Sequence, residues 1–340
     1  MSLHQPSLFA DDGPAKSDGH GQHLRAPFPY FGGKSGVASL AWYAFGGVKQ
    51  YIEPFAGSLA VLLGNPSGPA SLEVAGDLNG YIANFWRAVK YQPDQTWAEA
   101  DYPVSHVDLG ARHLWLTDPA RVAALNASLA DPEWPGNPRI AGWWAWGQCC
   151  WIGSGWCEER SKVPHTSDAG MGIQATGKVP HTGNAGMGIQ ATGQVPHTSN
   201  AGMGIESPPD GELLTPYQGH ALEWIRALSR RLARVRLIHG DWSRCLNHHY
   251  GKANTAIFFD PPYRAFERLY GKQAPVADAV AEWCREHEGE AKIALCGHAG
   301  DYSLPGWTEF PWDRGRLTYN SGKTTAKEAV WFSPTCRRVK

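Results

Sequence analysis

Residues 71–90, SLEVAGDLNGYIANFWRAVK, contain the change of pattern that decides the fold. Ser71 to Gly76 is a short and largely apolar run, typical of a strand, and Asp77 follows it directly. Asn79 to Lys90 then carries apolar residues at helical spacing, and these are Ile82, Phe85, Trp86 and Val89. A strand that ends at an acid and leads into an amphipathic helix is typical of a parallel sheet covered by helices.

The same unit recurs on both sides of this stretch. Ser35 to Phe45 predicts a helix, and Val48 to Ile52 predicts a strand that leads into Glu53 and Pro54. Later the pattern predicts helices over 217–234 and 274–288, and strands over 235–239, 256–259, 291–296 and 328–332. We therefore expect one α/β domain, formed by residues 25–92 and 217–340, with an insertion between these two segments.

The insertion, residues 93–216, loses this rhythm and is rich in proline, glycine and tryptophan. Residues 163–205 contain a repeat with a period of 16 whose copies begin Val-Pro-His-Thr. The equal spacing of the histidines suggests a metal site, but duplication alone explains it and is the interpretation we favour. For the tryptophan cluster we favour core packing over stacking on a base. Its members are Trp143, Trp144, Trp146, Trp151 and Trp156.

The composition is that of a globular protein, with 42% hydrophobic and 19% charged residues in a chain of 340. The net charge of -1 gives no overall basic field, so a nucleic-acid partner would need local positive surface. The seven cysteines form no Cys-x-x-Cys pair, which indicates free thiols in a reducing compartment. Since the sequence has no recognisable signal peptide or membrane span, we expect a cytoplasmic protein without a membrane partner.

Four of the predicted strands lead into an acid, and these acids are Glu53, Asp77, Asp241 and Asp260. One acid after a strand usually caps a helix or forms a turn. In open α/β sheets, however, ligands bind beyond the carboxyl ends of the strands, which is where these acids would meet. They therefore predict a ligand site at that edge of the sheet.

The residues at this edge suit a ligand that contains adenosine. Asp77, after the second strand, suits the hydroxyls of a ribose, and Gly57 lets the backbone approach a ligand closely. The chain has neither the Gly-x-Gly-x-x-Gly pattern nor a phosphate-binding loop that ends in Lys-Ser or Lys-Thr. S-adenosylmethionine, which contains adenosine but no pyrophosphate, fits these residues best.

Four motifs occur in order along the chain: PFPYFGGK at 27–34, YIEPFAGS at 51–58, GDLN at 76–79 and DPPY at 260–263. In sequence and in order they closely resemble the Dam-type, alpha-group DNA adenine-N6 methyltransferases, and in particular phage-encoded members. The resemblance covers residues 27–92 and about 217–334. It implies an S-adenosylmethionine-dependent methyltransferase fold, which is a mostly parallel seven-stranded sheet with helices on both faces. It also implies a target-recognition region in the insertion.

The resemblance further implies roles for the residues of these motifs. The residues expected to bind the cofactor are Tyr30, Gly33, Lys34, Glu53, Pro54, Phe55, Gly57, Asp77, Asn79, Asp241 and Asp260. The residues expected at the catalytic centre are Asp260, Pro261, Pro262 and Tyr263. The chain departs from the family's common Gly-x-Gly loop at Leu59, where a glycine is frequent, and this leaves the geometry of the loop open.

The DPPY motif suits methylation of an amine that is a poor nucleophile. A carboxylate accepting one N–H and the Pro261 carbonyl accepting the other would direct the nitrogen lone pair at the methyl group. The prolines stiffen the backbone behind Asp260, and Tyr263 could stack on a base turned out of the duplex. We expect a site-specific enzyme that methylates adenine in double-stranded DNA. Methylation of cytosine N4 or of RNA is one alternative, and a non-catalytic DNA-binding protein is the other.

The basic residues available for DNA lie in three groups. For Arg226, Arg230, Arg231, Arg234 and Arg236 we favour a solvated helix face over a DNA contact. Candidates in the insertion are Arg112, His113, Arg121, Arg139, Arg160, Lys162 and the repeat histidines His165, His181 and His197. Candidates near the end are Arg314, Arg316, Lys323 and Lys327. Residues 1–24 predict a disordered tail. Within this tail Gln5 to Phe9 resembles a sliding-clamp-binding peptide, although we favour a chance match.

Overall fold

The computed structural model describes residues 24–30, 32–102, 105–151, 156–157, 216–246, 254–263, 276–312 and 327–339. The tail with the possible sliding-clamp peptide and the repeat at 163–205 lie outside these residues. So do five of the basic candidates, namely Arg160, Lys162, Arg314, Arg316 and Lys323. Within the described part of the chain, no helix has the length and apolar character needed to cross a membrane.

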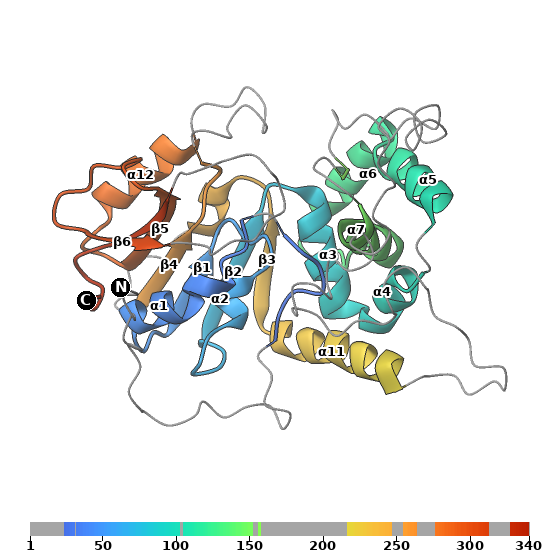
Figure 1. Ribbon diagram of the computed structural model, residues 1–340, viewed down its shortest axis with the longest axis horizontal. Coiled ribbons are helices and arrows are strands. Elements are labelled where there is room, and N and C mark those ends of the chain that lie inside the picture. The colour runs from blue at the N-terminus through green and yellow to red at the C-terminus, as the bar shows by residue number, and fades with distance from the viewer. Residues whose placement is uncertain are drawn as a thin grey trace, which may run out of the picture.

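A seven-stranded sheet organises the left half of the molecule in Figure 1. The strands are β1 (Gln50–Glu53), β2 (Leu72–Asp77), β3 (Val235–His239), β4 (Thr255–Phe259), β5 (Lys292–His298), β6 (Thr308–Trp312) and β7 (Glu328–Phe332). They lie in the order β3-β2-β1-β4-β5-β7-β6. β1 to β5 are parallel, and β7 lies antiparallel between β5 and β6. The predicted α/β fold with a mostly parallel seven-stranded sheet is confirmed.

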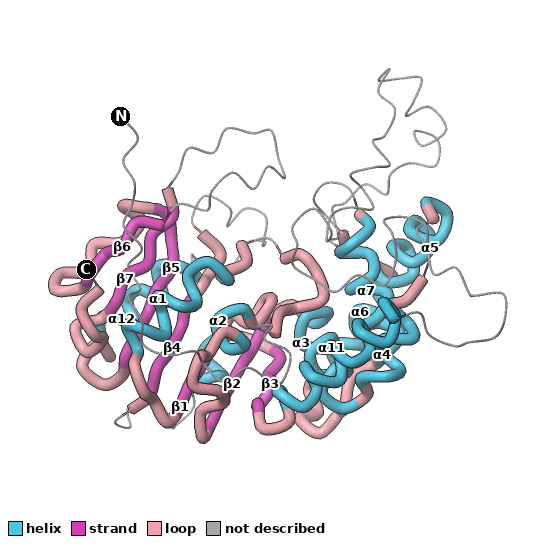
Figure 2. The backbone as a smooth tube through the Cα atoms, turned by 60° about the horizontal axis from the view of Figure 1, so that its bottom comes forward, coloured by secondary structure: helices cyan, strands magenta, loops and turns pink. Residues whose placement is uncertain are grey.

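Helices cover both faces of this sheet (Figure 2). The alternation of side chains along β4 places Phe258 in one hydrophobic cluster and Ile257 and Phe259 in another. The face with Phe258 is covered by α1 (Ser35–Phe45), α2 (Ala60–Leu63), α3 (Gly80–Tyr91) and α11 (Pro216–Leu232). The other face is covered by α12 (Val276–Glu286) and the short helix η1 (Trp242–Leu246). Burial on both faces is what a parallel sheet requires.

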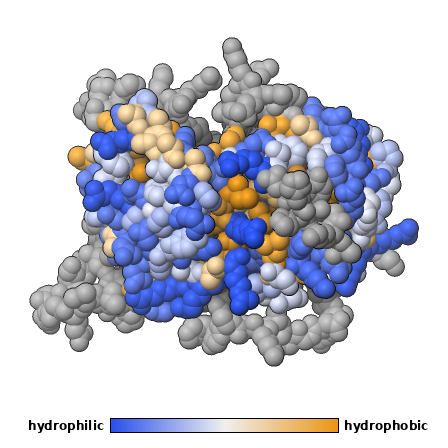
Figure 3. All heavy atoms as spheres, turned by 180° about the vertical axis from the view of Figure 1, so that it is seen from behind, coloured by the Kyte–Doolittle hydropathy of each residue, from blue (hydrophilic) through white to orange (hydrophobic). Residues whose placement is uncertain are grey.

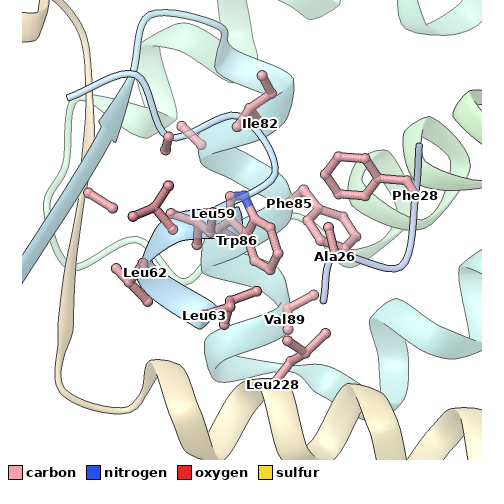
Figure 4. Close-up of a cluster of buried hydrophobic side chains, with 14 of the residues drawn as sticks. Ala26, Phe28, Leu59, Leu62, Leu63, Ile82, Phe85, Trp86, Val89 and Leu228 are labelled. Atoms are coloured by element: carbon pink, nitrogen blue, oxygen red, sulfur yellow. The ribbon is translucent and has the colours of Figure 1, made fainter. Parts of the chain in front are cut away.

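The first hydrophobic cluster connects the start of the described chain to the loop after β1 (Figure 4). The ring of Phe28 meets that of Phe85 on α3 edge to face, with their centroids 5.0 Å apart. Leu59 and Trp86 are both fully buried in the same cluster. Trp86 Nε1 donates a hydrogen bond to Gly57 O at 2.9 Å, so α3 holds that loop in place.

The described part of the insertion contains four helices beside α3 and α11 (Figure 1). They are α4 (Pro93–Ala100), α5 (His106–Leu116), α6 (Pro119–Leu129) and α7 (Pro138–Cys150). The sequence pattern did not predict them, although Ser105, Asp118 and Asn137 each cap a first turn by accepting a backbone hydrogen bond. The predicted core packing of the tryptophans is confirmed for the four that are buried here, Trp144, Trp146, Trp151 and Trp156.

Buried polar groups of α3 fix the chain after α6 and the start of α7. The Asn84 side chain of α3 donates to Asn137 O at 3.1 Å and accepts from Asn137 N at 2.7 Å. Arg87, also on α3 and buried, donates to Asp131 O at 2.7 Å and to Leu237 O of β3 at 3.3 Å. An unpaired buried donor costs about 1–3 kcal/mol, so these bonds favour one position of the helices.

On the reverse side, apolar surface gathers in the middle of the molecule with hydrophilic surface on either side (Figure 3).

The arginine-rich stretch lies at the amino edge of the sheet, where β3 begins. Arg226 pairs with Asp94 of α4 at the surface, with 2.9 Å between Arg226 Nε and Asp94 Oδ1. Arg231 departs from the predicted solvated face, because its Nη1 atom lies 2.5 Å from Oε2 of the buried Glu73 on β2. Arg230, Arg234 and Arg236 are exposed, as the favoured interpretation requires. The stretch therefore supports the fold at the edge opposite to the strand-end acids.

Replacing Arg231 by methionine should destabilise the protein by about 3–5 kcal/mol, because it leaves the Glu73 carboxylate, 1% exposed, without its counter-charge. The matched variant Arg226→Met breaks only surface ion pairs, with Asp94 and Glu223, and should cost less than about 1 kcal/mol. Urea titration gives the free energy of unfolding of each variant and of the wild type. Equal losses in the two variants would contradict the structural role of the Arg231–Glu73 pair.

Candidate functional site

The strand order places a topological switch point between β1 and β4. The chain builds β2 and β3 on one side of β1 and then returns to build β4 and β5 on the other side. Open α/β sheets bind ligands at such a point, outside the carboxyl ends of the strands. Glu53 ends β1 and Asp260 directly follows β4, so two of the predicted acids stand at the switch point.

Gly57 is the centre of the loop after β1. Its φ of +43° lies in the left-handed region, and a Cβ atom there would lie 2.7 Å from Cε1 of the Tyr30 ring. Gly57 N donates to Asp77 Oδ2 at 2.9 Å. Only glycine combines this backbone conformation with such a close approach. The loop therefore brings together three of the residues expected to bind the cofactor.

Asp77 ends β2 and is partly exposed beside this loop. Its Oδ1 atom accepts from Asn79 N at 2.9 Å, while the Asn79 side chain caps α3 by accepting from Tyr81 N. Burial raises the pKa of Asp77 to about 6, although the hydrogen bonds from the Gly57 and Asn79 backbone favour the ionised form. Each carboxylate oxygen has a second lone pair, so Asp77 can also accept hydrogen bonds from a ligand.

Glu53 is buried, and its Oε2 atom bonds to the protein itself. Oε2 accepts from Tyr51 OH at 2.9 Å and from Leu62 N of α2 at 3.0 Å. Burial raises the pKa of Glu53 to about 8 against the opposing effect of these two bonds, and the charge of Asp260 adds to the rise. Glu53 is therefore protonated at neutral pH, and it holds α2 in place rather than presenting a charge to a ligand.

On the other side of the switch point, Lys34 and Asp260 form an ion pair. Lys34 directly precedes α1, and its Nζ atom lies 2.9 Å from Asp260 Oδ2 and donates to Gly32 O at 2.7 Å. Asp260 is partly exposed, and no described residue donates a hydrogen bond to its Oδ1 atom. A carboxylate with one oxygen held by a buried lysine keeps the other oxygen available as an acceptor.

One short turn connects these two groups of residues. Gly33 N donates to Tyr30 O at 3.1 Å and closes the turn. Tyr30 at its start lies against Gly57, and Lys34 at its end pairs with Asp260. The turn therefore links the loop after β1 to the acid after β4.

Glu328 and His298, which the motifs did not indicate, also lie at this site. Glu328 is the first residue of β7, and because β7 is antiparallel, this residue stands at the carboxyl edge of β5. Its Oε2 atom accepts from Tyr263 OH at 3.3 Å and lies 3.8 Å from Lys34 Nζ. The ring of His298, the last residue of β5, meets the Tyr263 ring edge to face at 4.7 Å. In the sequence, Glu328 stood at the start of a predicted strand, in a stretch, 328–334, that resembles phage-encoded methyltransferases.

The remaining expected residues have local roles. Asp241 is exposed, and its Oδ1 atom accepts from Ser243 N at 3.0 Å at the start of η1. Leu59, where the sequence departs from a Gly-x-Gly pattern, adopts a left-handed φ of +53° and is fully buried, so the loop keeps a glycine-like backbone. The other motif residues lie at the two strand ends, with Pro54 and Pro261 buried and Phe55 and Pro262 partly exposed.

Arg112 and His113, which the sequence offered for DNA contacts, are instead buried in the helical part of the insertion. The Arg112 guanidinium lies over the rings of Tyr102, Trp143 and Trp146, at 4.0, 4.9 and 4.3 Å from their centroids. These cation–π contacts hold the residue inside, away from phosphates. Of the other described candidates, Arg121 and Arg139 have exposed side chains and Lys327 is exposed beside Glu328.

Comparison with models of known protein families finds no match for this chain, and comparison with curated proteins finds no relative. The function is therefore inferred from the chemistry of the site and from the ordered motifs of the sequence. Two groups of residues carry that inference: the Gly57 loop with Asp77, and the Lys34–Asp260 pair with Tyr263 and Glu328.

The free energy of unfolding of the Glu53→Gln variant should lack a pH dependence that the wild type shows. The native pKa of about 8 lies above the ordinary value of about 4.3, so the native state holds a proton that the unfolded state has released between these values. Wild-type stability should fall as pH rises through this window, by up to about 1.4 kcal/mol per pH unit relative to the variant. Urea titrations across the window measure it, with Glu309→Gln on β6 as an exposed control. Parallel curves for wild type and Glu53→Gln would contradict the assignment.

Proposed function

We propose that this chain is an S-adenosylmethionine-dependent DNA methyltransferase that methylates the exocyclic amine of adenine at specific sites in double-stranded DNA. The observation that carries the proposal is the position of Asp260, which follows β4 at the switch point with one oxygen paired to Lys34 and the other available. Gly57 lies in the loop after β1, and Asp77 is the last residue of the adjacent strand β2. A cofactor at the first two strands and a base at Asp260 would meet at one edge.

The residues on the cofactor side fit the chemistry of S-adenosylmethionine. The Asp77 carboxylate suits the two hydroxyls of a ribose, because both of its oxygens keep a lone pair after bonding to the backbone. The carboxylates of Asp260 and Glu328 outnumber the ammonium of Lys34, and this excess of negative charge favours a sulfonium cation. When bound, the cofactor supplies the methyl group.

Asp260 would act on the target amine through Oδ1, since Lys34 holds Oδ2. The Pro261 carbonyl would accept the second N–H, and no described backbone N–H competes for it. With the cofactor bound, the N–C bond would form as the S–C bond breaks with its electron pair left on sulfur, and the amine would release one proton to water. Asp260 need not be a strong base, because the amine becomes acidic only as the methyl group arrives. Its contribution is positioning and electrostatic stabilisation.

Support for DNA and for adenine comes from the four ordered motifs of the sequence. Tyr263 follows the two prolines after Asp260 and offers a ring on which a base turned out of the duplex could stack. Lys327 is exposed next to Glu328, where it could contact a phosphate. The helices of the insertion, α4 to α7, lie beside α3 and would add further DNA contacts.

Asp77→Asn should weaken cofactor binding at neutral pH about tenfold or more, because hydrogen bonds to a charged acceptor contribute about 1.5–3 kcal/mol. In the wild type the affinity should also fall below about pH 6, where Asp77 takes up a proton, and the variant should lack this decline. Calorimetric titration with S-adenosylmethionine at several pH values measures both effects. Glu282→Gln, an exposed acid on α12, is the control. A wild-type affinity that does not change across this range would contradict the role of Asp77.

Asp260→Ala should reduce methyl transfer by about 10²–10³-fold, because the amine loses the acceptor that directs its lone pair. The assay combines labelled cofactor, DNA of mixed sequence and nucleoside analysis, with Glu282→Gln as control and thermal unfolding as a check on folding. Asp260→Asn, which keeps one acceptor oxygen, should retain more activity than Asp260→Ala.

The methylated product decides between the alternatives. Methyl-adenine that depends on Asp260 supports the proposal, and sequencing of the modified sites then gives the recognition sequence. Methyl-cytosine, or transfer to RNA alone, would favour the enzymatic alternative. DNA binding without any transfer by the wild type would contradict the proposal and favour a non-catalytic DNA-binding protein.

A further inference from the structure

Glu328 connects Tyr263 and Lys34 through a single oxygen atom. Its Oε2 atom accepts from Tyr263 OH at 3.3 Å and lies 3.8 Å from Lys34 Nζ. Lys34 Nζ in turn lies 2.9 Å from Asp260 Oδ2. The Glu328 side chain is 13% exposed, so these contacts form where water screens charges weakly. A chain of polar contacts therefore runs from the aromatic ring to the proposed amine acceptor.

Other contacts fix the same ring. Tyr263 is buried, and Lys34 Nζ lies over its face at 5.2 Å from the centroid. The His298 ring meets it edge to face, and His298 N donates to Asp301 Oδ2 at 2.7 Å, which fixes the turn after β5. Tyr263 thus has partners at its hydroxyl and around its ring.

The sheet itself brings Glu328 and His298 together. The two residues are direct partners in the antiparallel pairing of β5 and β7. Directly opposed residues in such a pair place their side chains on the same face. Their relation to Tyr263 is therefore set by strand register, and strands position a side chain more rigidly than loops do.

From this geometry we propose that Glu328 is a positioning residue that orients the Tyr263 ring for stacking on the target base and shares Lys34 with Asp260. The inference rests on the proposed function and adds a residue to the same reaction. A buried ammonium without a counter-charge is costly, so a second carboxylate matters when the amine engages Asp260. Glu328 therefore helps to hold Lys34 beside Asp260 Oδ2 while the amine engages Oδ1. Glu328 in this way links the orientation of the target base on Tyr263 to the position of Lys34 beside Asp260.

The first test replaces Glu328 in the full chain. Glu328→Ala should lower kcat for DNA methylation about tenfold to a hundredfold, with a smaller change in the dissociation constant of S-adenosylmethionine. Glu328→Gln keeps an oxygen acceptor for the Tyr263 hydroxyl and should recover part of this loss. Glu309→Ala, an exposed acid on β6, is the matched control, and thermal unfolding checks that each variant folds. A kcat of Glu328→Ala within about twofold of wild type would overturn the inference.

The second test asks whether Glu328 acts through Tyr263. Tyr263→Phe keeps the ring and removes the hydroxyl, so Glu328→Ala should cost a smaller factor in that background than in the wild type. Fluorescence of 2-aminopurine at the target position, which rises when the base leaves the stack, should fall in Glu328→Ala and recover partly in Glu328→Gln. An equal cost of Glu328→Ala in both backgrounds would overturn the inference. A wild type that methylates no nucleic acid would instead contradict the proposed function.

Discussion

The Lys34–Asp260 ion pair is the contact on which the arrangement of the site depends. It joins the turn before α1 to the end of β4, two segments that lie far apart in the sequence. Burying a lysine to 4% exposure is costly unless a carboxylate balances its charge, so the turn is held over the switch point. Tyr30, at the other end of that turn, is then held against Gly57. One buried charge in this way keeps the loop after β1 aligned with the acid after β4.

The sheet and the edge that carries the candidate site could be predicted from the sequence. Several predicted strands lead into an acid, and the carboxyl ends of parallel strands lie at the same edge of a sheet. The roles of those acids could not be predicted from spacing. Glu53 is buried and bonds to Tyr51, whereas Asp241 is exposed and caps η1. Asp77 and Asp260 are partly exposed and keep capacity to accept further hydrogen bonds. Burial distinguishes the four residues, and burial results from the packing of the whole fold.

The features missed from the sequence have separate physical causes. Glu328 reaches the site only because β7 runs antiparallel, and the pattern of a strand does not reveal its direction. Helix α7 escaped notice because its three tryptophans and two glycines obscure the helical period. Arg112 and Arg231 were read as surface charges, yet aromatic rings hold the first inside and Glu73 pairs with the second. Such partners come from distant segments, which local patterns cannot show.

Burial also divides the acids of the site by charge at neutral pH. With pKa values of about 8 and about 6, Glu53 is protonated while Asp77 is ionised. The charge of Asp260 is one reason why Glu53 keeps its proton, so negative charge is concentrated on the residues that can face a ligand. Under the proposed function, a sulfonium cation beside Asp260 would offset part of that charge and lower the pKa of Glu53. By linkage, ionisation of Glu53 at high pH would then strengthen cofactor binding, provided that α2 stays in place.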